Sequence, residues 1–432
     1  MSFKDIHIIV NEDRKEKREP MVNITSIPKD KYHIVYTTFV IGGIFLLLPW
    51  NMFITIQDYF VSYKLSEDYT GSKTNLVTYF LTYLGIVSQI PSLLFEYVNL
   101  FINFNGDLRK RIQAILIFQI LLFTISAILA IVNTSHWPFI FFYLTMFTVF
   151  FINMATGIFQ NSLYGLAVLL PVHYVGAVII GTNISGIFTS LLSILIMSVS
   201  VSLPVLAISC FTTSALLLLI LFSVLYYLPK NKFYRFYTKK NNAEKLPKLK
   251  FNEILKLGLN YIKHLFNIFF VFFITLACFP TILSYIKKTD DDFIVSDKFF
   301  TVITCFLMFN IATTIGSITA KYIKCPNENT LTCFIVLRII FIPLFLLCNY
   351  IPPNTNRNLF IVIDNDYIYI FIVLLFGITS GHFSSLSFHY FVSSTKEKNV
   401  QASGMLGAIS LITGIFTGLA FSSVFPYIIQ NL

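Results

Sequence analysis

Residues 203–228 read LPVLAISCFTTSALLLLILFSVLYYL, and no charged side chain interrupts them. A helix needs about 20 apolar residues to cross the roughly 30 Å hydrocarbon core of a bilayer, so this stretch is long enough to span a membrane. The same pattern recurs along nearly the whole chain. It predicts eleven spanning segments, at residues 33–57, 76–102, 112–132, 138–166, 174–199, 203–228, 265–286, 299–323, 331–351, 367–392 and 400–428.

The composition of the 432 residues indicates that lipid surrounds the protein. Hydrophobic residues make up 56% of the chain and charged residues 12%, so a soluble fold would leave much apolar surface exposed to water. In lipid every backbone polar group must be satisfied within the protein, which leaves helices and closed barrels. Barrel strands are shorter and alternate apolar with polar residues, unlike these segments. The sequence therefore predicts an all-α polytopic membrane protein.

The charged connectors predict how the chain is divided and oriented. The longest connector, residues 229–263, carries ten Lys or Arg and two acidic residues, and basic residues gather in cytoplasmic loops. We expect a cytoplasmic N-terminal segment (1–31), a first bundle of six spans (32–228), this basic cytoplasmic loop and a second bundle of five spans (264–432). The N-terminus then lies in the cytoplasm and the C-terminus outside. The first span also serves as the targeting signal, because no apolar signal-peptide core precedes it.

The sequence also excludes several classes of function. The net charge is +10, but the basic residues gather in the predicted cytoplasmic connectors, so a nucleic acid polymer is not expected as a partner. The six cysteines form no CxxC pair and no cluster with histidine, which predicts apolar packing and no metal site. The chain contains no GxSxG, HExxH or P-loop motif. We therefore expect neither an enzyme nor a bound cofactor.

Polar side chains within the spans are costly in lipid, so they mark helix contacts or a hydrated path. In the second span Gln89 and Ser92 share one helix face. Glu96 is one of few carboxylates in a span; pairing with a loop base such as Arg111 and work on a proton or a substrate both stay open. In the fourth span the amide of Gln160 offers two donors and an acceptor, which suits a nucleobase edge or another polar heterocycle.

The second half of the chain contains a similar set. Asn310, Thr313 and Ser317 lie on one stripe of the eighth span. Arg338 in the ninth span is expected to extend its guanidinium to the cytoplasmic edge. His382 in the tenth span is expected to be buried and hydrogen-bonded.

The first span carries Pro49, Trp50 and Asn51 in a row, which fits a structural kink and a functional gate equally well. A bundle with interior amides and hydroxyls but few charges suits the passage of a neutral polar solute better than catalysis or ion conduction.

These polar residues belong to motifs that follow one another along the chain. The first span runs from Asp30-Lys31-Tyr32 to Leu47-Leu48-Pro49-Trp50-Asn51-Met52-Phe53, and the fourth contains Gln160-Asn161-Ser162-Leu163-Tyr164-Gly165. Later motifs are Phe279-Pro280, Cys305-Phe306-Leu307, Phe309-Asn310-Ile311, Leu337-Arg338 and Ala402-Ser403-Gly404. In these motifs and in their order, the chain resembles the equilibrative nucleoside transporter family.

The resemblance implies eleven helices in a six-plus-five arrangement like the major facilitator fold. It also implies facilitated nucleoside exchange by alternating access. By the same resemblance, Trp50 and Gln160 would contact the nucleobase, with Leu47 beside them. Gln89 would occupy a lining position of the second span, and Asn310 would line the cavity in the second half.

The chain departs from the family in the eighth span. Where the family commonly carries an Asp and, four residues on, an Arg associated with ribose recognition and gating, this chain has Thr313 and Ser317. Both charges are replaced together, so no unpaired charge is left buried. The hydroxyls still offer hydrogen bonds to a sugar, but weaker ones than charge-assisted bonds. A nucleobase or another small polar solute is therefore an alternative substrate.

The sequence thus predicts facilitative transport of nucleosides by a multi-pass protein of the plasma membrane, with the nucleoside or nucleobase and the lipid bilayer as its partners. The alternatives are a carrier of nucleobases or another small polar solute, a non-transporting receptor or scaffold with a carrier fold, and a membrane-embedded enzyme. The scarcity of carboxylates in the spans predicts passive transport and no proton coupling. The sequence gives no indication of the oligomeric state.

Overall fold

The computed structural model describes residues 28–72, 75–101, 107–171, 173–199, 202–241, 251–395 and 400–431. Within these residues every regular element is a helix, apart from an isolated bridge between Ile286 and Tyr350. Nine of the described helical segments are long and apolar enough to cross a membrane. Two shorter apolar helices, Phe80–Pro91 and Leu331–Leu346, lie where the second and ninth spans were predicted. The all-helical membrane fold is confirmed, and the count of eleven spans stays a prediction.

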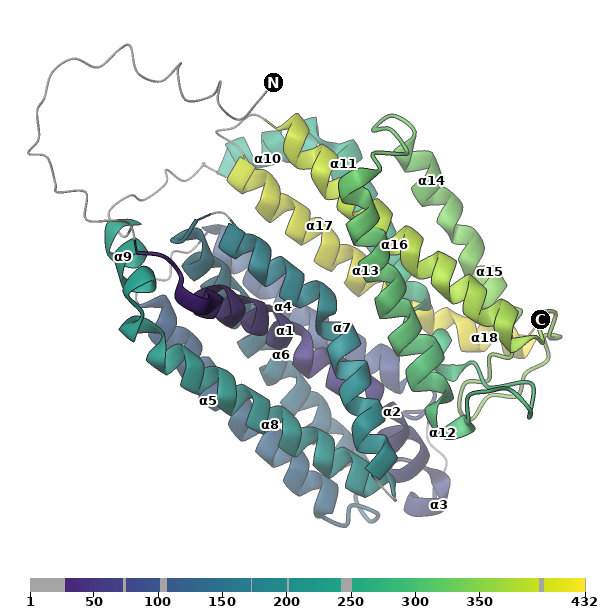
Figure 1. The fold of residues 1–432 in the computed structure, drawn as a ribbon. Helices are drawn as coiled ribbons and strands as arrows, with labels where there is room; N and C mark the ends of the chain where they lie inside the picture. The colour runs from purple at the N-terminus through teal and green to yellow at the C-terminus, as the bar shows by residue number, and fades with distance from the viewer. Residues whose placement is uncertain are drawn as a thin grey trace, which may run out of the picture.

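Six long helices form a first bundle in the first half of the chain (Figure 1). They are α1 (Ile34–Thr55), α4 (Phe80–Phe101), α5 (Leu108–Ile131), α6 (Pro138–Val168), α7 (His173–Val199) and α8 (Leu203–Tyr227). Short elements join α1 to α4, namely α2 (Gln57–Tyr59), η3 (Phe60–Lys64) and α3 (Glu67–Thr70). The predicted basic connector contains two further helices, α9 (Lys232–Asn241) and α10 (Phe251–Asn260).

The second bundle follows α10, and several of its spans are built from more than one piece. They comprise α11 (Ile262–Cys278) with η5 (Leu283–Tyr285), α12 (Asp297–Phe300) with η6 (Thr301–Leu307) and α13 (Met308–Tyr322), α14 (Leu331–Leu337) with η7 (Arg338–Ile340) and α15 (Phe341–Leu346), α16 (Asp366–Ser394), and α17 (Val400–Phe421) with η9 (Ser422–Val424) and α18 (Phe425–Asn431).

Local sequence signals set several helix ends. The side chain of Asp107 accepts hydrogen bonds from the backbone N–H groups of Arg109 and Lys110 and so caps the start of α5. The predicted seventh span extends to residue 286, but α11 ends at Cys278. Pro280 follows, and a proline cannot donate the backbone hydrogen bond that would continue a helix.

Glycines allow pairs of helices to approach closely in both bundles. A Cβ atom added to Gly43 of α1 would lie 2.2 Å from the carbonyl oxygen of Val178 on α7. A Cβ atom added to Gly381 of α16 would lie 1.9 Å from the carbonyl oxygen of Thr313 on α13. Small residues of this kind are the usual means by which helices pack in lipid, where little hydrophobic force drives them together.

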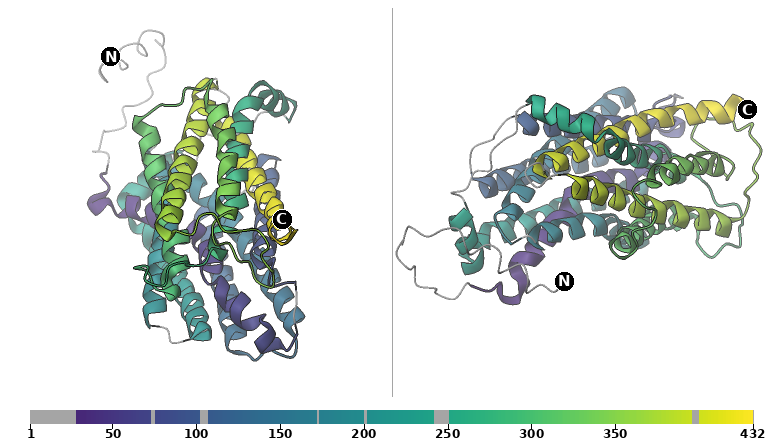
Figure 2. Two further views of the ribbon diagram at one scale, coloured as in Figure 1. Left: turned by 90° about the vertical axis from the view of Figure 1, so that its right-hand side faces the viewer. Right: turned by 90° about the horizontal axis from the view of Figure 1, so that it is seen from above.

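The bundles have two distinct ends, which we call the α9 end and the α3 end (Figures 1 and 2). Asp30 accepts a hydrogen bond from the Tyr174 hydroxyl at 2.9 Å, and the Tyr174 ring lies 5.4 Å from that of Phe233 on α9. The start of α1 and the helix α9 therefore lie at one end. The figures place α18, where the described chain finishes, toward the opposite end.

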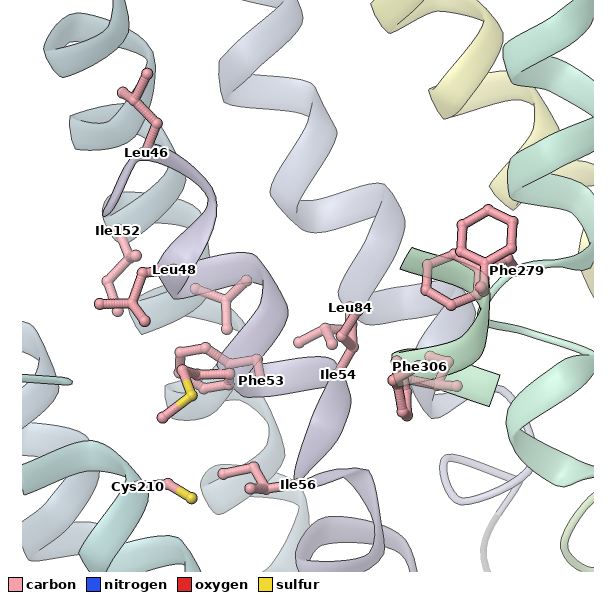
Figure 3. Packing of buried hydrophobic residues seen from close by; sticks show 14 of the residues in the cluster. Leu46, Leu48, Phe53, Ile54, Ile56, Leu84, Ile152, Cys210, Phe279 and Phe306 are labelled. Carbon is pink, nitrogen blue, oxygen red and sulfur yellow. The ribbon is translucent and has the colours of Figure 1, made fainter. Parts of the chain in front are cut away.

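One hydrophobic cluster joins the two bundles toward the α3 end. Figure 3 shows Ile54 and Leu84 of the first bundle facing Phe306, with Phe279 close by, and all four belong to this cluster. A second, smaller cluster, which includes Val271, belongs to the second bundle alone. The bundles therefore share a core at the α3 end.

Candidate functional site

From its start to Trp50, helix α1 presents one accessible face. Its accessible or half-buried positions are 34, 36, 37, 40, 41, 44, 47 and 50, which follow one side of the helix at spacings of three and four residues. Leu47 is 38% exposed and Trp50 half-buried. The other sides of α1 are covered by α6, α7 and α8. The face begins at the α9 end and stops at Trp50, because every residue from 51 to 57 is buried.

Helix α11 repeats this arrangement in the second bundle. Accessible or half-buried residues occur at 262, 263, 265, 266, 269, 270, 272 and 273. Every residue from 274 to 286 is buried. Each bundle thus contains a helix that is accessible from the α9 end to mid-depth and enclosed from there to the α3 end.

Hydrogen bonds between the bundles close the α3 end. Each joins neutral groups, so each contributes only about 0.5–1.5 kcal/mol net. The bonds run from Gln57 Nε2 to Ser284 O (3.3 Å), from Thr78 Oγ1 to Pro353 O (2.8 Å), and between Thr82 Oγ1 and Ser422 Oγ (3.1 Å).

Gln160 lies at nearly the depth of Leu47. Leu163 of α6 packs on Gly42 of α1, where a Cβ atom would lie 3.0 Å from the Leu163 side chain. From that level, Gln160 lies about 5 Å and Leu47 about 7 Å closer to the α3 end, at a rise of roughly 1.5 Å per residue. The two side chains are therefore within a few ångströms in depth.

Asn310 lies at the same depth. Its amide packs on Gly186 of α7, where an added Cβ atom would lie 2.0 Å from Asn310 Oδ1. Gly181, five residues earlier in α7, packs on Gly43 of α1. A rise of about 1.5 Å per residue then puts both Asn310 and Leu47 about 6–8 Å beyond that contact. The Asn310 amide also donates to its own helix at Phe306 O, at 2.8 Å.

Trp50 and Gln160 offer free polar groups at the end of the accessible face. Gln160 is half-buried, and within the described chain it makes no hydrogen bond. Gln119 on α5 provides a contrast: it is fully buried, and its Nε2 donates to Thr156 Oγ1 at 2.9 Å, one turn from Gln160. The Trp50 indole N–H likewise has no acceptor among the described residues. Gln119 holds α5 to α6, whereas Gln160 and Trp50 can bind a solute.

Thr313 and Ser317 lie on the interior side of α13. The exposed side of this helix carries Ile315 and Ile318, and 3.6 residues per turn put Thr313 and Ser317 on roughly the opposite side. Ser317 Oγ donates to Gly381 O on α16 at 3.4 Å. The Thr313 hydroxyl oxygen is buried and has no partner in the described part of the chain. The two hydroxyls therefore point inward, at the contact between α13 and α16.

Gln89 lies where α4 meets the second bundle. It shares a helix face with Thr82 and Gly85, and an added Cβ atom on Gly85 would lie 2.7 Å from Leu419 on α17. Gln89 is half-buried and donates weakly to Ser88 Oγ, at 3.4 Å. The side chains of Ser92 and Glu96 lie outside the described part of the protein.

The prediction for Arg338 is wrong. The side chain does not reach the edge of the bundle: it is 2% exposed and lies within the second bundle. It donates to Val271 O and Thr275 Oγ1 on α11, both at 3.1 Å, and to Thr379 Oγ1 at 3.3 Å and Phe376 O at 3.4 Å on α16. Because four acceptors on two helices bind the guanidinium inside the bundle, this position is more favourable than an extended side chain that reaches the edge.

His382 is buried and hydrogen-bonded, as predicted. Its Nδ1 lies 2.9 Å from Thr319 Oγ1 and its Nε2 lies 2.7 Å from Cys325 O. Four of the six cysteines are buried, but Cys325 and Cys333 are exposed, so the prediction of apolar packing is wrong for these two. No group of His, Cys, Asp or Glu among the described residues has a metal-binding arrangement.

The sequence did not single out the residues that join the bundles. Gln57 follows the last apolar residues of the first span and donates to the backbone oxygen of Ser284. A backbone acceptor can belong to any residue type, so the sequence does not reveal this contact. Thr314 of α13 donates to the carbonyl oxygen of Asn183 on α7 at 3.1 Å, again a backbone acceptor. Such contacts leave no pattern in the sequence, since every residue carries a carbonyl group.

The chain is similar to curated transporters over nearly its whole length. A sequence profile described as "Nucleoside transporter" matches residues 146–427. Human equilibrative nucleoside transporter 1 is 28% identical, over 93% of this chain and 99% of its own length. Human equilibrative nucleoside transporter 2 is 29% identical, over 92% of this chain and 98% of its own. Equilibrative nucleotide transporter 1 of Arabidopsis thaliana is 24% identical, over 90% of this chain and 86% of its own.

Solved structures share the fold at low sequence identity. The nucleoside transporter NupG superposes with a TM-score of 0.53 at 14% identity, covering 92% of both chains. A D-xylose–proton symporter superposes with a TM-score of 0.61 at 10% identity, covering 93% of this chain and 91% of its own. The arrangement of two helical bundles is that of the major facilitator fold. With the profile match covering well over half of the sequence, the chain belongs to the equilibrative nucleoside transporter family.

Proposed function

We propose that this protein carries nucleosides across a membrane by alternating access between its two bundles. The observation that carries the proposal is the pair of accessible faces on α1 and α11, which run in from the α9 end and stop at mid-depth. Trp50 lies where the face of α1 ends, and Gln160 and Asn310 lie at nearly the same depth from two other helices. A solute that entered from the α9 end would meet these polar groups before the buried seal.

Each proposed site residue has a role that fits its chemistry. Gln160 reads the edge of the base with its free amide, and Trp50 provides a ring for stacking and an N–H donor. Leu47 forms the apolar wall beside them. In this proposal Asn310 contacts the rest of the solute from α13, Thr313 and Ser317 add hydroxyl groups from the α13–α16 contact beside it, and Gln89 lines the path at the α4–α17 contact. The buried hydroxyl of Thr313 has no hydrogen-bond partner among the described residues, so it is available to bind a ligand or water.

The seal at the α3 end is weak enough to open during a transport cycle. It depends on a few neutral hydrogen bonds and a shared apolar core. Buried polar atoms near it, Gln57 Oε1, Tyr59 Oη and Ser284 Oγ, have no partner in the described residues. Unpaired buried groups cost about 1–3 kcal/mol each, so they bring the closed arrangement nearer in energy to an open one.

We further propose the orientation and location of the protein. The basic connector around α9 and α10 is assigned to the cytoplasm, with the N-terminus on the same side and the C-terminus outside, in the plasma membrane. The same connector divides the chain into bundles at 32–228 and 264–432. Transport is passive in this proposal, because the spans carry no acidic residue between their ends apart from Glu96.

Flux in proteoliposomes tests the proposal. The purified protein should exchange labelled adenosine or uridine with saturation, and the flux should be independent of an imposed proton gradient. Gln160→Ala should lower exchange by about tenfold, which corresponds to one or two lost hydrogen bonds. The matched control is Asn161→Ala, since the amide of Asn161 already donates to Gly157 O on its own helix at 3.1 Å.

The outcomes separate the alternatives. Faster exchange of adenine or uracil than of their nucleosides would support the nucleobase carrier, which the Thr313 and Ser317 replacements favour. Absence of flux from folded protein would support a receptor or scaffold, and chemical change of the solute would reveal an enzyme. Equal flux by Gln160→Ala and the native protein would remove Gln160 from the site.

A further inference from the structure

A cleft of about 460 Å³ lies between the bundles at the α3 end. It is on the far side of the buried seal from the accessible faces of α1 and α11 and is therefore separate from the proposed central site. The first bundle contributes residues of α2, η3 and α3, and the second contributes η5 and residues 351–356. The lining residues used below are Asp58, Glu67, Tyr285, Lys287 and Asn356. Its volume is within the usual range of small-molecule sites, about 300–1,000 Å³.

Two polar groups in the cleft wall have no hydrogen-bond partner among the described residues. The carboxylate of Asp58 makes no hydrogen bond or ion pair with the described residues. Burial raises the pKa of Asp58 above its ordinary value, and the nearby charge of Lys287 offsets only part of this rise. Tyr285 is 5% exposed, and its hydroxyl has no partner in the described chain. Polar groups withdrawn from solvent in this way, Tyr285 fully and Asp58 in part, are normally satisfied by protein, ligand or water.

The rest of the lining suggests which ligand these groups would take. Asp58 and Glu67 are acceptors for hydroxyl or amino donors, and Lys287 adds a donor. Pro352 and Ile351 add an apolar surface against which a flat ring can lie. A carboxylate is well suited to accept two hydrogen bonds from neighbouring hydroxyl groups. The combination fits an uncharged solute that carries a ring and a vicinal diol.

We propose that this cleft is a second nucleoside site, whose occupant contacts both bundles and holds the α3 end closed. The identity of the ligand rests on the proposed nucleoside transport. The ribose diol binds to the Asp58 carboxylate, and the base lies against the 351–353 segment. Because both walls meet only when the α3 end is closed, the ligand binds that arrangement preferentially and shifts the population toward it. Nucleoside at the α3 end thus slows the carrier at high concentration.

Protection from chemical labelling tests this site directly. Asn356 is exposed and lines the cleft, so Asn356→Cys provides a thiol there. Purified protein is labelled with a maleimide in detergent, and the modified peptide is quantified by mass spectrometry, which separates it from the exposed Cys325 and Cys333. Adenosine at about twice its dissociation constant should slow labelling about threefold. Adenine, which lacks the diol, should not protect.

Matched variants locate the effect. In the Asn356→Cys background, Asp58→Asn should abolish protection, whereas Asp68→Asn, which makes the same charge change on α3 outside the cleft lining, should retain it. Gln160→Ala should also retain protection, because it changes only the central site. Equal labelling rates with and without adenosine up to about 10 mM would overturn the proposal. A site with a dissociation constant above that concentration would be almost empty during transport. Protection lost in Gln160→Ala, or kept in Asp58→Asn, would overturn it too.

Transport gives an independent measurement. Exchange by the native protein should decline at high adenosine concentration, and Asp58→Asn should remove the decline. Protection without any flux would leave the cleft site standing and refute the proposed transport. Flux without protection would refute the cleft site alone, and would leave water as the occupant of the cleft.

Discussion

Arg338 is the clearest case of a residue whose role depends on its neighbours. A buried cation loses its hydration, and this loss is repaid only if the surroundings supply hydrogen bonds. Here α11 and α16 supply four acceptors, and the ring of Phe376 lies 5.0 Å from the guanidinium carbon. The guanidinium therefore links three spans of the second bundle.

Arg338→Lys separates this buried role from the edge position predicted by the sequence. A lysine ammonium keeps the charge. It lacks the planar, forked guanidinium that reaches acceptors on two helices at once, so at least two charged hydrogen bonds are lost. We expect a loss of about 2–4 kcal/mol of stability, and an unfolding temperature in detergent lower by roughly 5 °C or more. Arg235→Lys is the control, because Arg235 is exposed on α9. An unchanged unfolding temperature for Arg338→Lys would favour the edge position.

At the scale of helices, glycine contacts set how closely the spans approach one another. Gly43 with Gly181 brings α1 against α7, and Gly186 brings the Asn310 amide of α13 onto the same helix. Helix α7 is therefore the element that relates the depth of α1 to the depth of α13. A side chain added at Gly186 would change the contact between bundles without altering either bundle's core.

Gly186→Ala tests the contact between α7 and α13. The new methyl group would occupy the position of the Asn310 amide, with 2.0 Å to Oδ1, so Asn310 or the whole of α13 must move. We expect exchange in proteoliposomes to fall about tenfold, the result of roughly 1.4 kcal/mol of displaced contact. Gly176→Ala in the same helix is the control, because nothing lies within 4 Å of its added Cβ atom. If both variants exchange at the native rate, nucleoside exchange does not require Asn310 to occupy this position.

For the whole molecule, the decisive feature is the asymmetry between its ends. The bundles share an apolar core and several hydrogen bonds toward the α3 end, while accessible faces of α1 and α11 extend from the α9 end. Alternating access requires that this asymmetry can reverse by movement of one bundle against the other. The contacts at the α3 end must therefore break once in every cycle.

A reversible cross-link at the α3 end tests that requirement. Thr82 Oγ1 and Ser422 Oγ lie 3.1 Å apart on opposite bundles, close enough for a disulfide between Thr82→Cys and Ser422→Cys. With the exposed Cys325 and Cys333 replaced by serine, oxidation should abolish nucleoside exchange and reduction should restore it. Each single variant is a control that should exchange equally under both conditions. Full exchange by the oxidised double variant would contradict movement at this contact.

Sequence reasoning located the helices well because the signal for them is local. Predicted and observed limits agree within a few residues for the spans at 138–166, 174–199 and 203–228. Long apolar runs need no tertiary information to become helices in lipid, since their backbone must be satisfied within the segment. The seventh and ninth spans were predicted too long: they were expected to reach residues 286 and 351, but α11 ends at Cys278 and α15 at Leu346.

The sequence by itself therefore determined that this chain is a bundle of membrane helices, and its motifs identified the family. Tertiary structure alone decided that Arg338 faces inward, that Gln160 is free while Gln119 is bonded, and that the α3 end is closed. The physical reason is that apolar helix formation depends on the composition of one segment. Pairing of a polar group depends on which other helix lies opposite it, and here many of those partners are backbone carbonyls that every residue type provides.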